Sequence, residues 1–475
     1  MRFCTANKAH ASGLRLNEYA NMNNLLRSRF VANYGMFFVL LLLCAYFSIM
    51  TVAEQNPVSA RAGQGVANYI VENHPNANVL IVVPEGVNDH LYAEAVRETL
   101  EAGSPNVVGF VVGEAKDAAT ELNRLGEAGI EVRFIVTQYN AANNWFVLGE
   151  KQLADKAAKY PSLRQAQVAK PPSYRWPTFL MPAHLLTVAN QTALVAIVAI
   201  GMTLVIITAG IDLSVASLIA FAGVVVSVLI NFYLEFTFYS VAYCLVCASL
   251  TAVLASAITG VFTGAIVTRF DLPAFIVTLG VMQIGRGLAW KVAGGSEPVR
   301  VESEAFHHLS AGADLVGIPN PVVIMAVLYI AAHILMSHTT LGRYLYAVGG
   351  NPEAARLSGV PVKSVIVFAY AICGALAGLG GVLDASMFSN GRSTGAMGYE
   401  LQVIAAVVVG GTSLAGGQGK MLGTLIGALI LGVIADGMRL TNVAIDTQMI
   451  VFGSLIIIAV LIDKLKSRRW RGSNQ

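Results

Sequence analysis

Three polar side chains stand inside or beside long apolar runs of this sequence. Asp212 lies in the turn Gly210–Ser214 between two such runs, and Gln283 and Arg286 lie one helical turn apart in another. Polar groups placed in this way can hydrogen-bond to a polar solute, and ionisable groups within a membrane are usually functional. Asp212 can instead cap the following helix, and Arg286 can instead extend to a membrane surface. Both alternatives stay open.

Other kinds of chemistry find little support in the sequence. The stretch Gly410–Lys420 ends in Gly-Lys, but it lacks the first glycine of a phosphate-binding loop, and Met421 stands where Ser or Thr is needed. Cys244 and Cys247 have CxxC spacing inside an apolar run, which favours helix packing. The eight histidines show no metal-ligand spacing. We therefore expect no cofactor or metal on this chain, no enzymatic activity and no nucleic-acid partner.

A polar stretch, residues 349–361, separates two long apolar runs and must lie at a membrane surface. Basic residues in and around it, such as Arg343 and Lys363, indicate the cytoplasmic side. The pair Asn351-Pro352 is a turn signal, and Gly359 ends the pattern, so a short helix is predicted over Pro352–Ser358. Such a helix is either an ordinary loop helix or a docking element. The docking element would comprise Asn351, Pro352, Glu353, Ala354, Ala355, Arg356, Leu357, Ser358 and Gly359.

The composition is that of a membrane protein. Of 475 residues, 55% are hydrophobic and only 12% are charged, and the mean hydropathy is +0.63. Basic residues before the first apolar run and after the last put both termini in the cytoplasm, which requires an even number of crossings. Ten segments are expected to cross: 34–52, 193–209, 215–230, 239–267, 273–290, 321–336, 362–383, 401–414, 421–435 and 449–462. The short, Gly-rich segment 401–414 is either a crossing or a re-entrant helix.

Residues 54–176 have a different composition from the rest. Strands at 78–83, 107–112 and 131–136 alternate with helices, which predicts a βαβαβ unit with a parallel sheet. Lys170–Pro177 reads as a stiff linker back to the membrane. The sequence thus predicts a polytopic α-helical membrane protein of about ten transmembrane helices with an inserted extracytoplasmic α/β domain. The parts are a leader (1–33), a first transmembrane helix (34–53), the α/β domain (54–176), the main membrane domain (177–464) and a basic tail (465–475).

Small residues one turn apart let membrane helices approach closely. Three glycine pairs with this spacing are predicted to pack helices together: Gly260 with Gly264, Gly374 with Gly378, and Gly423 with Gly427.

Several motifs have the order and spacing of a known family. They are 200–214 (IGMTLVIITAGIDLS), 273–280 (PAFIVTLG), 349–360, 399–406 and 410–419 (GGTSLAGGQG). Over about 179–464 the chain resembles the membrane permeases of bacterial ABC importers for monosaccharides such as ribose, xylose and galactose. Each motif is weak by itself, and their agreement in order makes the resemblance specific.

The resemblance implies a permease subunit of the bacterial inner membrane that imports a small sugar by alternating access. Its implied partners are a second permease copy, an extracytoplasmic sugar-binding protein, the lipid membrane and a cytoplasmic ABC ATPase subunit that hydrolyses the ATP. In such importers a short cytoplasmic helix docks onto the ATPase, and here that role falls on Pro352–Ser358. The candidate translocation-path residues are Asp212, Thr278, Gln283, Arg286 and Gln402.

This chain also departs from the family pattern. Ala209 and Ala216 stand where glycine is usual, and Gln402 stands where an acid is common. The family has no counterpart of the α/β domain, for which partner docking is favoured over direct sugar binding or a purely structural cap. Two rival functions are a membrane receptor and a substrate-gated channel that use this domain as a sensor. A receptor would need a cytoplasmic output domain, which the loops on the predicted inner side do not contain.

Overall fold

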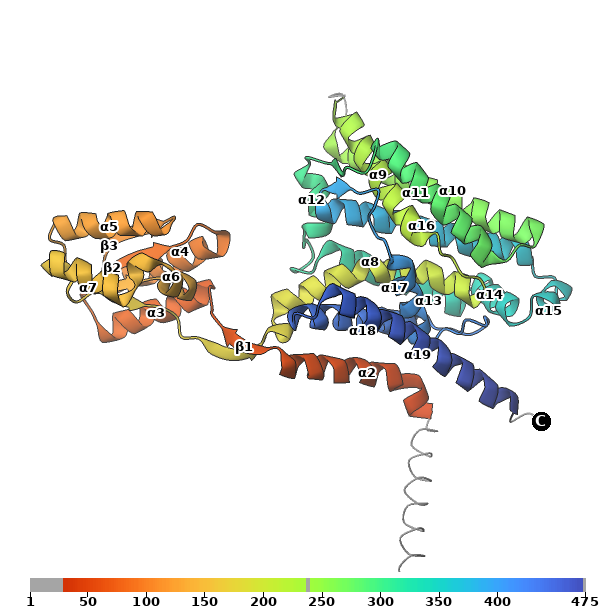
Figure 1. Cartoon of the computed structure of the whole chain (residues 1–475), viewed down its shortest axis with the longest axis horizontal. Coiled ribbons are helices and arrows are strands. Elements are labelled where there is room, and N and C mark those ends of the chain that lie inside the picture. Colours follow the sequence, from red (N-terminus) through yellow and green to blue (C-terminus); the bar gives the residue numbers. More distant parts are fainter. Residues whose placement is uncertain (1–28, 236–239, 473–475) are drawn as a thin grey trace, which may run out of the picture. The chain divides into compact units, whose positions relative to one another are not determined.

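The structure is a computed structural model that describes residues 29–235 and 240–472, and its contacts divide the chain into two units (Figure 1). The helical unit comprises the chain up to Thr51 and from Phe179 onwards, and the α/β unit is Val52–Thr178. Of the predicted leader, residues 1–28 lie outside the described part, as do the last three residues of the predicted tail.

The α/β unit is built on a four-stranded parallel sheet. Its strands follow the spatial order β3-β2-β4-β5. They are β2 (Asn78–Val83), β3 (Asn106–Val112), β4 (Phe134–Val136) and β5 (Gln167–Ala169). The central strand β2 reads NVLIVV, and such a continuous apolar run is typical of a strand that is covered on both faces.

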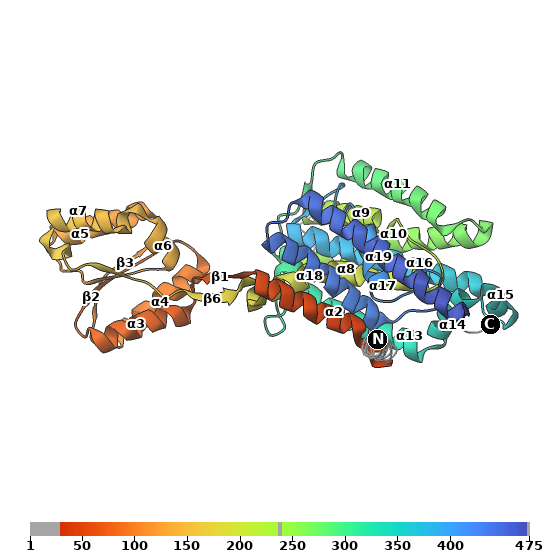
Figure 2. The same ribbon diagram turned by 60° about the horizontal axis from the view of Figure 1, so that its bottom comes forward.

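Helices cover both faces of this sheet (Figure 2). α3 (Ala60–Asn73) and α4 (Val87–Glu101) pack on one face, where they meet Ile81 of β2. α5 (Ala115–Glu127) packs on the other face against Leu80. Because successive strand residues point to opposite faces, the apolar side chains of β2 contribute to both cores.

This unit contains elements that the sequence did not predict. The sheet has a fourth strand, β5, and two further helices, α6 (Tyr139–Asn144) and α7 (Glu150–Lys159), precede it. A strand of three residues is too short to leave a periodic signal in the sequence. The predicted stiff linker contains β6 (Tyr174–Pro177), which pairs antiparallel with β1 (Val52–Gln55). Its proline stands at the strand end, where a missing N–H group is tolerated.

The helical unit has a helix at each of the ten segments that the sequence predicts to cross the membrane. These are α2 (Arg29–Met50), α8 (Pro182–Ile207), α9 (Val215–Glu235), α10 (Val241–Phe270), α11 (Ala274–Ala293), α13 (Asn320–His338), α16 (Val362–Phe388), α17 (Tyr399–Val409), α18 (Met421–Leu440) and α19 (Ile445–Gly472). Within the described residues, six of them are long and apolar enough to cross a membrane, namely α8, α9, α10, α13, α16 and α18. The polytopic helical architecture is therefore confirmed, and the count of ten crossings stays a prediction.

Some helices extend past the apolar runs that predicted them. α8 begins at Pro182 instead of Ala193, and α9 continues to Glu235 through residues predicted as a loop from Asn231. Hydropathy marks only the part of a helix that matches the hydrocarbon layer, so helical turns at the membrane surface escape it. α17 has only 11 residues and ends at Val409 with Gly410 as its C-cap, and whether the segment 401–414 crosses the membrane or re-enters it stays a prediction.

The six glycines of the predicted packing pairs lie where helices touch. A Cβ atom at Gly374 of α16 would lie 2.4 Å from the Ser256 carbonyl oxygen of α10. One at Gly427 of α18 would lie 2.0 Å from the Ala406 carbonyl oxygen of α17. A Cβ atom built at any of the other four glycines would lie 2.2 to 2.9 Å from an atom of a neighbouring helix or of its cap; these are Gly260, Gly264, Gly378 and Gly423. Larger residues would push these helices apart.

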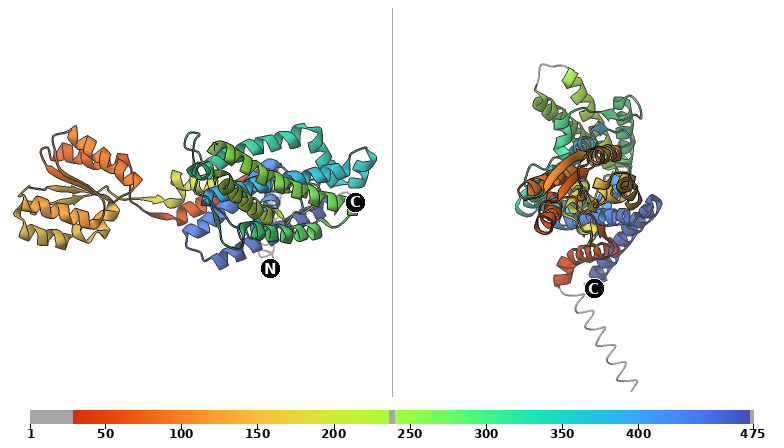
Figure 3. Two further views of the ribbon diagram at one scale, coloured as in Figure 1. Left: turned by 90° about the horizontal axis from the view of Figure 1, so that it is seen from above. Right: turned by 90° about the vertical axis from the view of Figure 1, so that its left-hand side faces the viewer.

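The helix axes lie roughly along one common line, with chain directions that differ between helices, so the helical unit has two ends (Figure 3). α13 has 19 residues and spans about 28 Å at 1.5 Å per residue. It leads to α14 (Thr340–Gly350) and α15 (Pro352–Leu357), and α16 then runs back. We call the end that holds α15 the α15 end and the opposite one the far end. The far end holds β7 (Val299–Arg300), α12 (Glu304–Ala311) and β8 (Asn390–Gly391).

Candidate functional site

α15 is a short helix with both ends fixed by hydrogen bonds. Asn351 is its N-cap, and the Asn351 Oδ1 accepts hydrogen bonds from the backbone N–H groups of Glu353 and Ala354 at 3.1 and 3.0 Å. Pro352 occupies the first helical position, where no N–H group is needed. The helix ends one residue before the predicted end, with Ser358 as its C-cap.

Gly359 terminates α15 in a left-handed conformation, with φ of +82°. The Val360 N–H donates to the Ala355 carbonyl, and the Gly359 N–H donates to the Arg356 carbonyl, both at 3.0 Å. This pair of bonds is the Schellman motif, which satisfies the last carbonyl groups of a helix. Glycine suits this position because a side chain would be strained there.

The outer surface of α15 is open to contact. Leu357 is 84% exposed, whereas Ala355 is buried against the helical unit. Glu353 and Arg356 form an exposed ion pair at 2.8 Å, which adds little stability. A rigid helix that presents an exposed leucine between charged side chains offers a defined surface for a partner.

Gly349, just before α15, is wedged between two other motifs. A Cβ atom at this position would lie 1.7 Å from the Ile207 carbonyl oxygen and 2.6 Å from the Gly417 nitrogen. The Gly417 N–H itself donates to the Ile207 carbonyl at 2.8 Å. Gly416 and Gly417 have φ of +84° and +69°, a region that favours glycine. We call Ile207, Gly349, Gly416 and Gly417 the glycine junction.

A further contact ties α14 to the loop 410–420. The Tyr346 hydroxyl donates to the Gly419 carbonyl at 2.8 Å. The end of α8, the start of α15 and the loop between α17 and α18 thus meet at the α15 end. The junction consists of backbone-to-backbone contacts, so it joins these three segments without intervening side chains.

Asp212 is fully buried in the turn between α8 and α9. Its Oδ1 accepts hydrogen bonds from the backbone N–H of Ser214 at 2.9 Å and from the Ser214 hydroxyl at 2.6 Å. Burial raises the pKa of the Asp212 carboxyl group, and the bonds from Ser214 oppose that shift. The geometry is that of a cap on α9, one of the two interpretations that the sequence left open.

Of the predicted path residues, only Thr278 lies beside this turn. It is buried on α11, and its hydroxyl donates to the Phe275 carbonyl at 3.2 Å and, more weakly, to the Ile211 carbonyl at 3.4 Å. Thr278 therefore holds the start of α11 against the turn that contains Asp212.

The other predicted path residues lie away from Asp212. Gln283 is exposed on α11, and Gln402 is partly exposed in the first turn of α17. Arg286 lies two turns beyond Thr278, and its Nη1 donates to the Ser393 and Gly395 carbonyls at 3.0 and 2.8 Å. The five predicted residues thus do not form one site.

Sequence reasoning missed a buried ion pair at the far end. The Arg392 Nη2 lies 3.0 Å from the Asp384 Oδ2, and the Arg392 guanidinium stacks over the Phe388 ring at 4.0 Å. Asp384 directly follows the predicted crossing 362–383, so an acid at the end of an apolar run was the available signal. Its partner is eight residues away, beyond the end of α16, where no helical spacing points to it.

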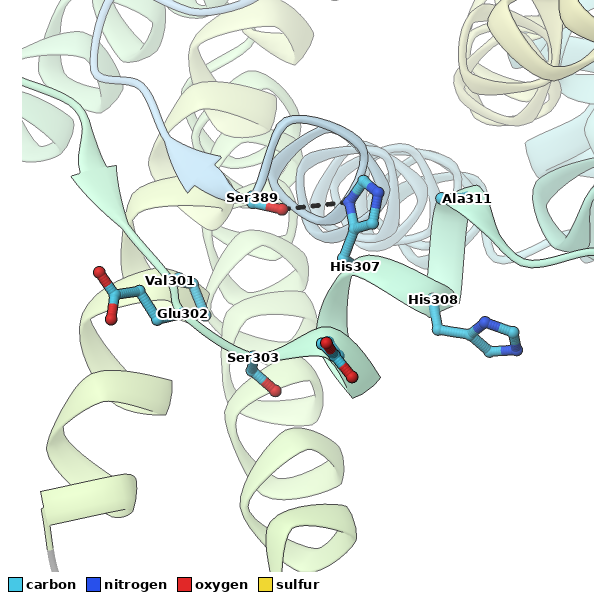
Figure 4. Close-up of a pocket in the computed structure, with 8 residues that line it drawn as sticks. Val301, Glu302, Ser303, His307, His308, Ala311 and Ser389 are labelled. Atoms are coloured by element: carbon cyan, nitrogen blue, oxygen red, sulfur yellow. Dashed lines mark hydrogen bonds between the residues drawn. The ribbon is translucent and has the colours of Figure 1, made fainter. Parts of the chain in front are cut away.

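A groove of about 680 Å³ also opens at the far end, and Glu302 and His307 are among its lining residues (Figure 4). The His307 Nδ1 lies 3.1 Å from the Ser389 hydroxyl. His308 turns away from His307 and bonds to Asp314 at 2.7 Å. Over the part of the chain that the structure describes, no three metal-ligating side chains gather. Among the described residues, the groove therefore brings together no set of side chains that could hold a metal ion.

Six helices that are long and apolar enough to cross a membrane, with the capped helix α15 at one end of them, are the architecture of a multi-pass membrane protein. The chain belongs to the family described as branched-chain amino acid transport system / permease component, whose profile matches residues 184–460. ATP hydrolysis takes place on a separate subunit in transporters of this type, so this chain is a permease and not an enzyme. The expectation of a multi-pass protein of the bacterial inner membrane is borne out at this level.

Curated relatives carry the names of sugar permeases. The ribose import permease protein RbsC of Escherichia coli (strain K12) is 43% identical over 294 residues, which cover 61% of this chain and 88% of the relative. RbsC of Bacillus subtilis (strain 168) is 35% identical over 291 residues, with 61% and 88% covered. The L-arabinose ABC transporter permease protein AraH of Azospirillum brasilense is 35% identical over 295 residues, with 62% and 84% covered.

The match to the family begins at residue 184, so the α/β unit lies outside it. No solved structure matches the chain significantly.

Proposed function

We propose that this chain is the membrane-spanning subunit of an ATP-driven monosaccharide importer. In this proposal α15 binds the ATPase subunit and moves when that subunit changes conformation during ATP hydrolysis. The glycine junction carries this proposal, because it joins a rigid, exposed helix to α8 and to the loop after α17 through backbone contacts. A movement imposed on α15 would therefore change how these helices pack.

The proposed substrate is a pentose of the ribose type. The family description names branched-chain amino acids, whereas the relatives reported above carry the names of sugar permeases. The relatives that align over most of their length are named for ribose and arabinose, and the ribose permease of Escherichia coli has the highest identity of those given above. Gln402 is one position at which sugar preference could differ from relatives with an acid there.

We propose that the α15 end and both termini face the cytoplasm. α2 runs parallel to α18, because Phe47 near the C-terminal end of α2 contacts Gly437 near the C-terminal end of α18. Thr51 and Phe179, where the chain leaves and re-enters the helical unit, meet at the far end through a 3.2 Å hydrogen bond. A cytoplasmic α15 end would then put residues 52–178 outside, in accord with the positive-inside rule.

In this arrangement the α/β unit is a docking module for an extracytoplasmic partner, and the proposed partner is the sugar-binding protein. The unit has its own two-sided core and lies outside the family match, so it can be added to a permease without altering the membrane helices. The proposed assembly contains this chain, a second permease copy, a cytoplasmic ATPase subunit and the sugar-binding protein. Gln283 and Gln402, which are exposed or partly exposed, are the proposed path-facing residues.

Partner identification tests this proposal. The tagged chain, purified in mild detergent from its native membrane, is expected to carry an ATPase subunit with it. A matched preparation of the Glu353→Arg variant, whose charge on α15 is reversed, is expected to lose that subunit while the permease still inserts. An assembly without any ATPase would contradict the importer function and favour a channel. A receptor function is not favoured, because the matched family consists of transport components.

A further inference from the structure

The connection between α16 and α17, residues 389–398, is an irregular segment at the far end that two arginines hold in place. It leaves α16 at Ser389 in a left-handed conformation, with φ of +52°, and enters α17 through Gly398, with φ of +84°. β8 within it pairs with β7. We call residues 389–398 the latch segment.

One end of the latch segment is anchored by the ion pair of Arg392 with Asp384. Asp384 is buried, Arg392 is one-third exposed at the side chain, and the guanidinium also covers the Phe388 ring. Separating the two would leave a carboxylate buried without its partner, which is strongly unfavourable. This contact ties the latch segment to α16, the helix that precedes it.

The other end is held by Arg286, which comes from α11. Its Nη1 donates to the carbonyl groups of two buried residues of the latch segment, Ser393 and Gly395. The Ser393 hydroxyl also donates to the Gly295 carbonyl, just after α11, at 3.2 Å. Arg286 therefore ties α11 to the segment that leads into α17.

The two arginine contacts differ in how readily they can break. Arg286 is half-buried and bonds to neutral carbonyl groups, so its release leaves no buried charge without a partner. Glu400, in the first turn of α17, lies close enough to attract the Arg286 guanidinium and offers it a second partner. Glu400 would therefore keep a charged partner near the guanidinium once it leaves the carbonyl groups.

We propose that Arg286 is a positioning residue that holds the latch segment closed over the start of α17 and releases it when the far end opens. The Arg392 contact is the fixed anchor, and the Arg286 contact is the releasable one. This inference rests on the proposed import function, because opening at the far end is the step that admits substrate. Sugar hydroxyl groups can donate to the Ser393 and Gly395 carbonyls in place of the guanidinium.

Protection of a cysteine in the latch segment tests the inference. Ser393 is fully buried, so Ser393→Cys in the full chain, in vesicles that expose the far end, should react slowly with a membrane-impermeant maleimide. Adding Arg286→Met removes both bonds and should raise the labelling rate about tenfold, whereas Arg286→Lys keeps a cationic donor and should restore most of the protection. The parent chain with its native cysteines sets the background.

A charge-matched control is Lys291→Met, which removes an exposed cation from the same helix. It should leave the Ser393→Cys labelling rate unchanged. Equal protection with and without the Arg286→Met substitution would overturn the inference, as would a rate that rises equally in the Lys291→Met control. The labelling assay does not require transport. If the assembly imports no sugar but the variants show the expected labelling rates, the proposed function is refuted and the inference about Arg286 is still supported.

Discussion

Replacing Gly349 with alanine adds one methyl group at the glycine junction, and the structure gives the size of the clash. The new Cβ would lie 1.7 Å from the Ile207 carbonyl oxygen, and an ordinary contact begins at 3.4 Å, so the two backbones must separate by about 1.7 Å. Overpacking of this kind costs about 1–3 kcal/mol. Loss of the Gly417–Ile207 hydrogen bond adds about 1 kcal/mol. The expected penalty is therefore about 2–4 kcal/mol on the arrangement that joins α15 to α8.

The assay is ATP-driven sugar uptake by the complete importer in proteoliposomes, measured beside its rate of ATP hydrolysis. Gly349→Ala is expected to lower uptake at least tenfold, since about 1.4 kcal/mol corresponds to a factor of ten. Hydrolysis should fall much less, because α15 and its exposed face are unchanged. The variant should thus hydrolyse more ATP for each sugar molecule transported.

Gly350→Ala is the matched control, because no atom lies within 4 Å of a Cβ built at that neighbouring position. Alanine is a better helix former than glycine by about 1 kcal/mol, so this variant should be as active as the parent. Normal coupling in Gly349→Ala would refute the role of the junction. Equal losses in both variants would also refute it, because the effect would not come from the clash.

Three further predictions concern α15 and the buried ion pair. Asn351→Ala removes the cap of α15 and should destabilise that helix by about 1 kcal/mol. The expected result is weaker binding of the ATPase subunit in a pull-down titration. An unchanged affinity would argue against a preformed helix. Glu353→Arg should abolish uptake while surface labelling shows normal insertion, and normal uptake would refute docking at α15. Asp384→Asn leaves Arg392 without its carboxylate and should cost about 3 kcal/mol, the low end for a buried pair because Arg392 is one-third exposed. A drop in the melting temperature in detergent should follow, and an unchanged value would contradict the anchoring role.

The local features of α15 could be predicted from the sequence because they depend on neighbouring residues. Asn351-Pro352 and Gly359 act through caps and a left-handed turn within one short stretch, and the structure has the helix within one residue of the expected bounds. The ten apolar segments could be predicted for the same reason, since hydropathy is a local property.

The contacts that join these elements could not be predicted. The glycine junction joins residues from three motifs that are distant in the sequence, namely Gly349, Ile207 and Gly417. No pattern within any one motif predicts that their backbones touch. Arg286 was recognised as unusual, but its carbonyl partners lie more than 100 positions away in the chain. β5 was missed because three residues carry no periodicity.

ATP-dependent uptake of labelled ribose shows directly whether this chain is the membrane subunit of a sugar importer. The chain is reconstituted with the ATPase subunit and sugar-binding protein that purify with it, and uptake is measured with ATP, without ATP and with a non-hydrolysable analogue. An ATP-driven importer should accumulate ribose against a gradient only when ATP is hydrolysed and the binding protein is present. Passive ribose flux that needs neither would contradict it and would make the chain a channel.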